Sequence, residues 1–202
     1  MIKRALAIFI CTFSVLTQLF AGGGSEIGTE TLNVVATTSI IGDVVSNIGG
    51  DVIALTILIE RGQDPHSFQA TPSVLSAIET ADLIFVNGFD LEESLLEDIN
   101  AVAKSPVVAV SEGIEPHSIE HDDGHGHEDG APNPHVWFDP TSILIWAENI
   151  EKHLSAADPV NGDGYHSRAA QYRARLADLD KSIRQRVALI PVSYTHLRAH
   201  ET

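Results

Sequence analysis

The sequence is poor in cysteine. Its 202 residues contain one cysteine, Cys11, and this lies inside an apolar run at 5–16. Two basic residues precede the run and small residues follow it at 21–24, which is the pattern of a cleaved export signal. We therefore expect a signal peptide over residues 1–23 and a mature chain without cysteine. Disulfides and cysteine-based zinc sites are then excluded, and His, Asp and Glu remain as strong metal ligands.

The N-terminal segment also lacks an uninterrupted apolar stretch long enough to be a good membrane span. Thr12, Ser14, Thr17 and Gln18 interrupt it, so a retained membrane anchor is the weaker interpretation. Cys11 does not follow a small-residue cleavage motif, which argues against lipidation there. We predict a secreted protein of the periplasm or cell envelope.

Basic residues are scarce as well. The chain has 12 Lys and Arg against 28 Asp and Glu, which gives a formal net charge of −16. Such a field repels nucleic acid and anionic lipid, and it raises the local concentration of divalent cations. Nucleic acid is therefore excluded as an expected partner.

The region from 30 to 140 alternates short β-branched runs with helical patterns. Strands are expected at 32–38, 51–60, 82–87 and 107–110, and helices at 40–48, 71–80 and 91–103. This alternation predicts an α/β fold, namely a Rossmann-like lobe with a four-stranded parallel sheet covered on both faces. Ligands of such sheets bind beyond the carboxyl ends of the strands, where His66 follows the second expected strand.

After Pro140 the spacing becomes helical throughout. Apolar residues recur every three or four positions, first at 143–154 and again at 165–190. We expect a long linker α-helix over 141–191, continuous across a kink near Asp158 and Pro159.

Two Pro-His segments suggest the chemistry. They are Asp64-Pro65-His66 and the run from Asn133 to Pro140 that contains His135. A His in a Pro-containing turn is more often a surface residue, but two in matching contexts favour metal ligation. Asp139 either orients an imidazole as a hydrogen-bond partner or caps the following helix.

A His-rich loop at 115–130 lies between these segments. It contributes four imidazoles among carboxylates, at His117, His121, His125 and His127. The loop is either a plain polar connection or an auxiliary site that binds cations weakly in many arrangements. An excess of imidazole ligands favours zinc over manganese.

The two Pro-His segments, with the His-rich insert between them and the helical region after them, resemble the cluster A-I periplasmic metal-binding proteins. The resemblance covers about residues 32–191. It implies a receptor that delivers Zn²⁺, or alternatively Mn²⁺, to a metal ABC transporter permease, with two α/β lobes joined by a long helix. It also implies that His66 and His135 are the metal ligands of the first lobe. The second lobe is missing after the helix, so we expect a truncated chain with an anomalous tail at 192–202.

Enzyme motifs are scarce. The segment at 125–129 begins like the HxHxD motif of zinc hydrolases, but Gly130 stands where that motif requires His. HExxH, a nucleophile elbow and a phosphate-binding loop are all absent from the sequence. We therefore expect no catalysis. A periplasmic metal buffer or an adhesin that works without a permease remains the alternative to the receptor.

Overall fold

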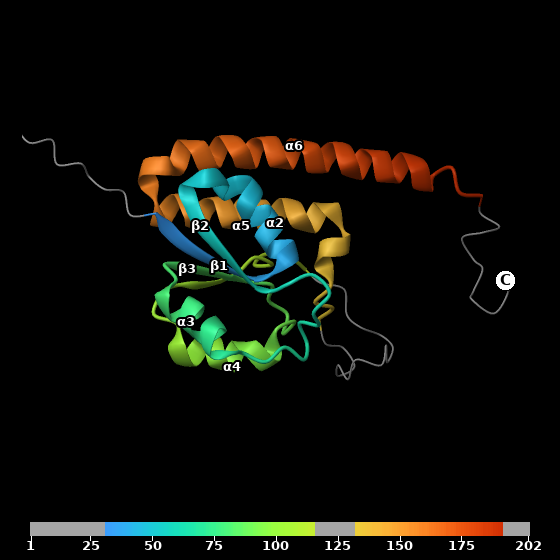
Figure 1. Cartoon of the computed structure of the whole chain (residues 1–202). Coiled ribbons are helices and arrows are strands. Elements are labelled where there is room, and N and C mark those ends of the chain that lie inside the picture. The colour runs from blue at the N-terminus through green and yellow to red at the C-terminus, as the bar shows by residue number, and fades with distance from the viewer. Residues whose placement is uncertain (1–30, 116–131, 192–202) are drawn as a thin grey trace, which may run out of the picture. The chain divides into compact units, whose positions relative to one another are not determined.

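The described residues, 31–115 and 132–191 of a computed structural model, form an α/β lobe around a four-stranded sheet (Figure 1). The strands are β1 (Leu32–Thr38), β2 (Ile53–Ile59), β3 (Leu83–Val86) and β4 (Val107–Ala109). All pairs are parallel and the order is β2-β1-β3-β4. The predicted fold class is confirmed, and the order reverses between β1 and β3, which is where such sheets bind ligands.

The helices between the strands are α2 (Ser39–Gly49), α3 (Pro72–Thr80) and α4 (Glu93–Val102). Thr38 and Thr71 start the first two, because each side chain accepts a hydrogen bond from a backbone amide of the first turn. The second strand begins two residues later than predicted, since Gly50–Val52 form a 3₁₀ turn.

The core has two layers because successive strand residues point to opposite faces. Val34 and Ala36 pack with α2 and with the helices that follow residue 139, whereas Val35 packs with α3 and α4. Apolar residues cover both faces of β1 and β3, as expected of a buried parallel sheet.

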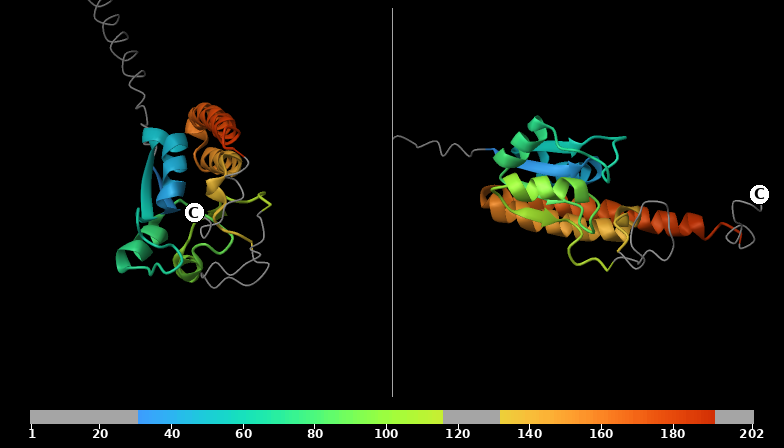
Figure 2. Two further views of the ribbon diagram at one scale, coloured as in Figure 1. Left: turned by 90° about the vertical axis from the view of Figure 1, so that its right-hand side faces the viewer. Right: turned by 90° about the horizontal axis from the view of Figure 1, so that it is seen from below.

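The long helix that the second apolar series predicts is present, but it is not continuous with the helix before it, so one unbroken helix over 141–191 is not observed. The segment forms α5 (Pro140–Ala157), a 3₁₀ turn η4 (Pro159–Asn161) and α6 (Gly162–Val187). The chain reverses between the two helices, which lie side by side in both figures (Figures 1 and 2). Pro159 lacks an N–H to continue α5, and the Asp158 carboxylate accepts hydrogen bonds from the Asn161 amide and the Tyr165 hydroxyl.

The first half of α6 belongs to the lobe. Tyr165 is fully buried, and the Arg168 guanidinium donates to the carbonyls of Ile48 and Gly49 at the end of α2. Beyond Leu176 the helix has exposed apolar residues, among them Leu179 and Val187. None of the helices in the described part of the chain is long and apolar enough to cross a membrane.

Candidate metal centre

The structure brings the two histidines of the Pro-His segments together. His66 lies in the loop after β2, and His135 lies just before the short 3₁₀ turn η3 (Val136–Phe138) that leads into α5. Their Nε2 atoms are 3.4 Å apart, and the ring centroids are separated by 5.5 Å at an interplanar angle of 55°. Both side chains are half-buried. The pair lies beyond the carboxyl ends of the strands, as expected.

The distance between the nitrogens suits a shared metal ion. Zinc binds imidazole nitrogen at about 2.0–2.1 Å in tetrahedral geometry, and two such bonds place their nitrogens about 3.3 Å apart. The separation of 3.4 Å between the Nε2 atoms of His66 and His135 is close to this value.

The two histidines sit in turns of the same construction. The Asp64 carboxylate accepts a hydrogen bond from the backbone N–H of His66 at 3.0 Å. The Asn133 side chain accepts one from the backbone N–H of His135 at 2.9 Å. In each turn a proline stands between the acceptor and the histidine. This is an Asx turn, in which a side chain takes the place of a backbone carbonyl.

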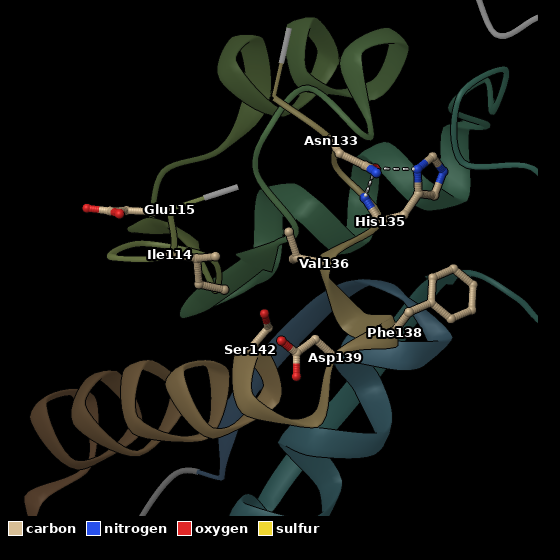
Figure 3. Close-up of a pocket in the computed structure, with 8 residues that line it drawn as sticks. All are labelled: Ile114, Glu115, Asn133, His135, Val136, Phe138, Asp139 and Ser142. Carbon is tan, nitrogen blue, oxygen red and sulfur yellow. Dashed lines mark hydrogen bonds between the residues drawn. The ribbon is translucent and has the colours of Figure 1, made fainter. Parts of the chain in front are cut away.

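Asn133 also fixes the tautomer of His135. Its Oδ1 atom lies 2.9 Å from the ring Nδ1 of His135, and Figure 3 shows this contact beside the backbone bond. Because the backbone N–H can only donate, the Asn133 atom must be oxygen, and Nδ1 must therefore carry the proton. The lone pair of a neutral ring is then on Nε2, the atom that faces His66 Nε2 at 3.4 Å.

Asp139 caps a helix. Its carboxylate accepts a hydrogen bond from the Thr141 amide at 2.8 Å, which confirms the capping role that the sequence left open. The polar partner of the His135 ring is instead Asn133. Composition and spacing do not single out Asn133, although the parallel between Asp-Pro-His and Asn-Pro-His is a signal that points to it.

The two aromatic residues after His135, Trp137 and Phe138, differ in how far they are buried. Trp137 stands edge-on to the His135 ring at 5.2 Å between centroids and packs partly against the core. Phe138 is 80% exposed and lies against the Trp137 ring, at 5.7 Å between centroids. Of the two residues, only Trp137 therefore contributes to the core.

A cavity of about 330 Å³ lies on the other side of His135 (Figure 3). Carboxylates, apolar groups and one hydroxyl line it, from Ile114, Glu115, Asn133, His135, Val136, Phe138, Asp139 and Ser142. Two of these lining residues, Glu115 and Asp139, are acidic.

A buried carboxyl lies behind the His135 turn. Glu92 is fully buried, and its Oε1 atom accepts hydrogen bonds from the Thr37 hydroxyl and from the Asn87 backbone N–H. Burial raises the pKa of Glu92 above its ordinary value, and these hydrogen bonds offset only part of that effect. Nothing in the sequence marked this residue, since an acidic residue at the start of a helix is usually solvated.

Within 31–115 and 132–191, no group of three or more His, Cys, Asp or Glu side chains could hold a metal ion. The predicted auxiliary ligands His117, His121, His125 and His127 lie outside the described residues, as does the segment that resembles a hydrolase motif. The described residues thus offer two imidazoles to one ion.

The family described as "Zinc-uptake complex component A periplasmic" matches residues 34–201. The chain is 35% identical over 197 residues to the manganese ABC transporter substrate-binding lipoprotein PsaA of Streptococcus pneumoniae, a match that covers 94% of this chain and 62% of that protein. It is 33% identical over 201 residues to the iron-binding protein YfeA of Yersinia pestis, covering 98% of this chain and 63% of that protein. The chain therefore spans less than two thirds of the length of these relatives.

Solved structures of similar fold are also described as metal-binding proteins or as ZnuA. A manganese-bound periplasmic metal-binding protein of Candidatus Liberibacter asiaticus superposes with a TM-score of 0.70 at 34% identity, covering 78% of this chain and 57% of the other. A crystal structure of ZnuA superposes with a TM-score of 0.72 at 25% identity, covering 80% of this chain and 61% of the other.

Proposed function

The chain belongs to the family of periplasmic component A proteins of zinc-uptake complexes, and on that premise we propose that it is the extracytoplasmic metal receptor of an ABC importer. The observation that supports this role most directly is the pair of Nε2 atoms at 3.4 Å, at the edge of the sheet where ligands bind. In this proposal His66 and His135 are ligands to one metal ion, which is cargo and is not consumed or changed.

Zinc is the cargo we propose, with manganese as the alternative. Imidazole is a ligand that suits zinc, and a nitrogen-containing site binds Zn²⁺ more tightly than Mn²⁺ in the usual order of divalent metals. The four histidines at 117–127 add imidazoles near the site in sequence. Manganese is the alternative because PsaA and the Liberibacter protein are named for it.

The proposed partner is a membrane permease, and the proposed location is the cell envelope. PsaA is named as a substrate-binding lipoprotein of an ABC transporter, and the Liberibacter protein is named as periplasmic. We propose that the protein releases its ion to the permease without chemical turnover. A carrier of this kind needs imidazoles that bind and release, and the half-buried pair has that accessibility.

Calorimetric titration of the purified chain with zinc tests the proposal. One site that binds zinc more tightly than the others is expected, and His66→Ala and His135→Ala should each remove it, although two imidazoles alone predict an affinity well below that of a site with four protein ligands. The matched control is His166→Ala, because His166 is an exposed histidine on α6 that pairs with Glu151. If the tight site persisted in the double variant of His66 and His135, the assignment would be wrong.

Two further measurements separate the alternatives. Competition between Zn²⁺ and Mn²⁺ for the tight site identifies the preferred cargo. In cells, loss of this gene and loss of the permease gene should produce the same defect in metal uptake. A buffer or adhesin would keep its effect without the permease, and a hydrolase would show zinc-dependent turnover that His66→Ala abolishes.

A further inference from the structure

The His135 turn is attached to the core through one buried amide. The side-chain Nδ2 of Asn87 donates to the carbonyl oxygen of Pro134 at 3.0 Å, and Pro134 is itself buried. Pro134 directly precedes His135, so this bond fixes the backbone from which the imidazole extends. Asn87 is fully buried and follows the last residue of β3.

Asn87 is in turn held by Glu92. The backbone N–H of Asn87 donates to Glu92 Oε1 at 2.8 Å, and the hydroxyl of Thr37, in β1, donates to the same oxygen. One carboxyl oxygen therefore links the ends of two neighbouring strands, β1 and β3. A buried carboxyl is unfavourable unless its hydrogen bonds are made, so its position here calls for a reason.

Backbone strain accompanies this arrangement. Gly88, Phe89 and Asp90 all have positive φ, at 88°, 53° and 56°. Phe89 is a bulky residue in a conformation that side chains other than glycine seldom adopt, and such strain persists only where surrounding contacts enforce it. The strained segment returns the chain from β3 so that Glu92 lies next to Asn87. Strain of this kind is concentrated at functional sites.

The start of α4 also contacts the other histidine turn. The Ser94 hydroxyl donates to the carbonyl oxygen of Phe68 at 2.8 Å, two residues after His66. Residues 92–94 thus connect to both sides of the histidine pair, through Asn87 on one side and directly on the other.

We propose that Glu92 and Asn87 are positioning residues for metal binding, which hold the Pro134–His135 backbone so that the His135 imidazole faces His66. This inference deepens the proposed function and rests on it. Neither residue touches the metal. Their effect is transmitted through one carbonyl, that of Pro134, and through the ring orientation that Asn133 then fixes.

The carboxyl group acts here as an acceptor of two hydrogen bonds, and a neutral amide can do the same. Among the described residues, Glu92 Oε2 and Asn87 Oδ1 have no hydrogen-bond partner. Glu92→Gln keeps an acceptor oxygen for Thr37 and Asn87 and replaces only the Oε2 atom, which has no hydrogen-bond partner among the described residues. Rescue by glutamine therefore distinguishes the positioning role from a requirement for negative charge.

Zinc titration of the full chain tests the proposal. Changes to groups that orient metal ligands typically reduce affinity about 10-fold to 100-fold, and we expect a loss at the lower end, about 10-fold, for Glu92→Ala and for Asn87→Ser. Glu92→Gln should stay within about threefold of the unchanged protein. The matched control is Glu93→Gln, the same change at the adjacent exposed position. Unchanged affinity in Asn87→Ser, or an equal loss in Glu92→Gln, would overturn the proposal.

A readout without metal separates this inference from the proposed function. Nitrogen NMR of the imidazole rings in the metal-free protein should show the Nδ1-protonated tautomer at His135. In Asn87→Ser and Glu92→Ala this signal should shift toward a tautomer mixture, and Glu92→Gln should restore it. Should Glu92→Ala fail to fold, Asn87→Ser alone carries the test. If no zinc bound at the histidine pair, the proposed function would fail while the tautomer result still decided the positioning role.

Discussion

The Asp64-Pro65-His66 and Asn133-Pro134-His135 turns have the same backbone construction but different surroundings. In the first turn the accepting side chain, Asp64, is exposed. Its second oxygen accepts a hydrogen bond from the nearby Ser67 hydroxyl at 2.7 Å. In the second turn Pro134 is buried and its carbonyl is held by Asn87, which is remote in sequence.

This difference indicates how one site can be both ordered and accessible. The His135 half has a backbone tied to the core by Asn87, and its ring tautomer is set by the local bond to Asn133. The His66 half lies on a loop with a local bond between Gln63 and Glu60 and with one bond from α4, in which Ser94 donates to the Phe68 carbonyl. If His66 and His135 are the ligands that we propose, a histidine tied to the core and a histidine on a more exposed loop would let an ion be bound at defined geometry and still be released.

The largest effect is expected from removing either imidazole. His66→Ala and His135→Ala should each lower zinc affinity by more than about 100-fold, beyond the range seen when only an orienting group is lost. Restored binding on adding free imidazole would indicate that the cavity left by the side chain remains formed. Competition with a chromogenic chelator measures the zinc affinity of each variant, with and without added imidazole. A loss of less than about tenfold in either variant would contradict equal ligand roles for the two turns.

The next effect tests the asymmetry of the turns directly. Asn133→Ala removes the bond that holds the His135 ring, and we expect zinc affinity to fall about 10-fold to 100-fold. Ser67→Ala removes an exposed local bond of the other turn, that to Asp64, and about a twofold change in affinity is expected. Calorimetry at one pH compares them. Equal losses in the two variants would show that the turns do not differ in how firmly they hold their histidines.

The sequence was sufficient for the fold and for the two central histidines. Strand 32–38 was predicted as observed, and the other strands agree within a few residues, because β-branched runs between Gly and Pro signals leave few alternatives. His66 and His135 could be named because their Pro-His contexts match. Whether they bind metal stays a prediction.

Other features could not be read from local patterns. The reversal at Asp158 looked like a kink, because the apolar spacing is the same in one long helix and in two helices that pack together. Glu92 has the sequence context of a solvated helix start, and only the tertiary structure places it in the core. Asn133 was visible as part of a motif, but its bond to the ring depends on side-chain geometry that spacing does not encode.

We expect the stability of the protein to depend on pH through Glu92, the buried carboxyl behind the His135 turn. The pKa of Glu92 is raised above its ordinary value of 4.5 by burial, whereas in the unfolded chain it is ordinary. Its contribution to the free energy of unfolding is therefore complete below pH 4.5 and is lost as pH rises through the raised folded-state pKa. Glu92→Gln has no such loss, so relative to the unchanged protein it should become more stable as pH rises.

Urea unfolding over a pH series from about 4 to 8 measures this difference. Glu93→Gln serves as the control, because Glu93 is exposed and its replacement changes the net charge by the same amount. A stability difference between Glu92→Gln and the unchanged protein that stayed constant with pH would contradict the assignment of a buried titrating carboxyl to this position.

The smallest effect on tight binding is expected from the His-rich segment. Replacing His117, His121, His125 and His127 together by Asn removes imidazoles that the sequence assigns to weak capture, while the turns of His66 and His135 keep their own hydrogen bonds. The number of weakly bound zinc ions should fall, but the affinity of the tightest site should change by less than about threefold, because the sequence predicts donors there that bind weakly in many arrangements and add little to the proposed site of His66 and His135. Titration with zinc in the presence of a chelator of known affinity separates the two classes of site. If the tightest site disappeared with these four histidines and survived His66→Ala, the metal centre would lie in the segment, and the contrast between the two turns would not govern binding.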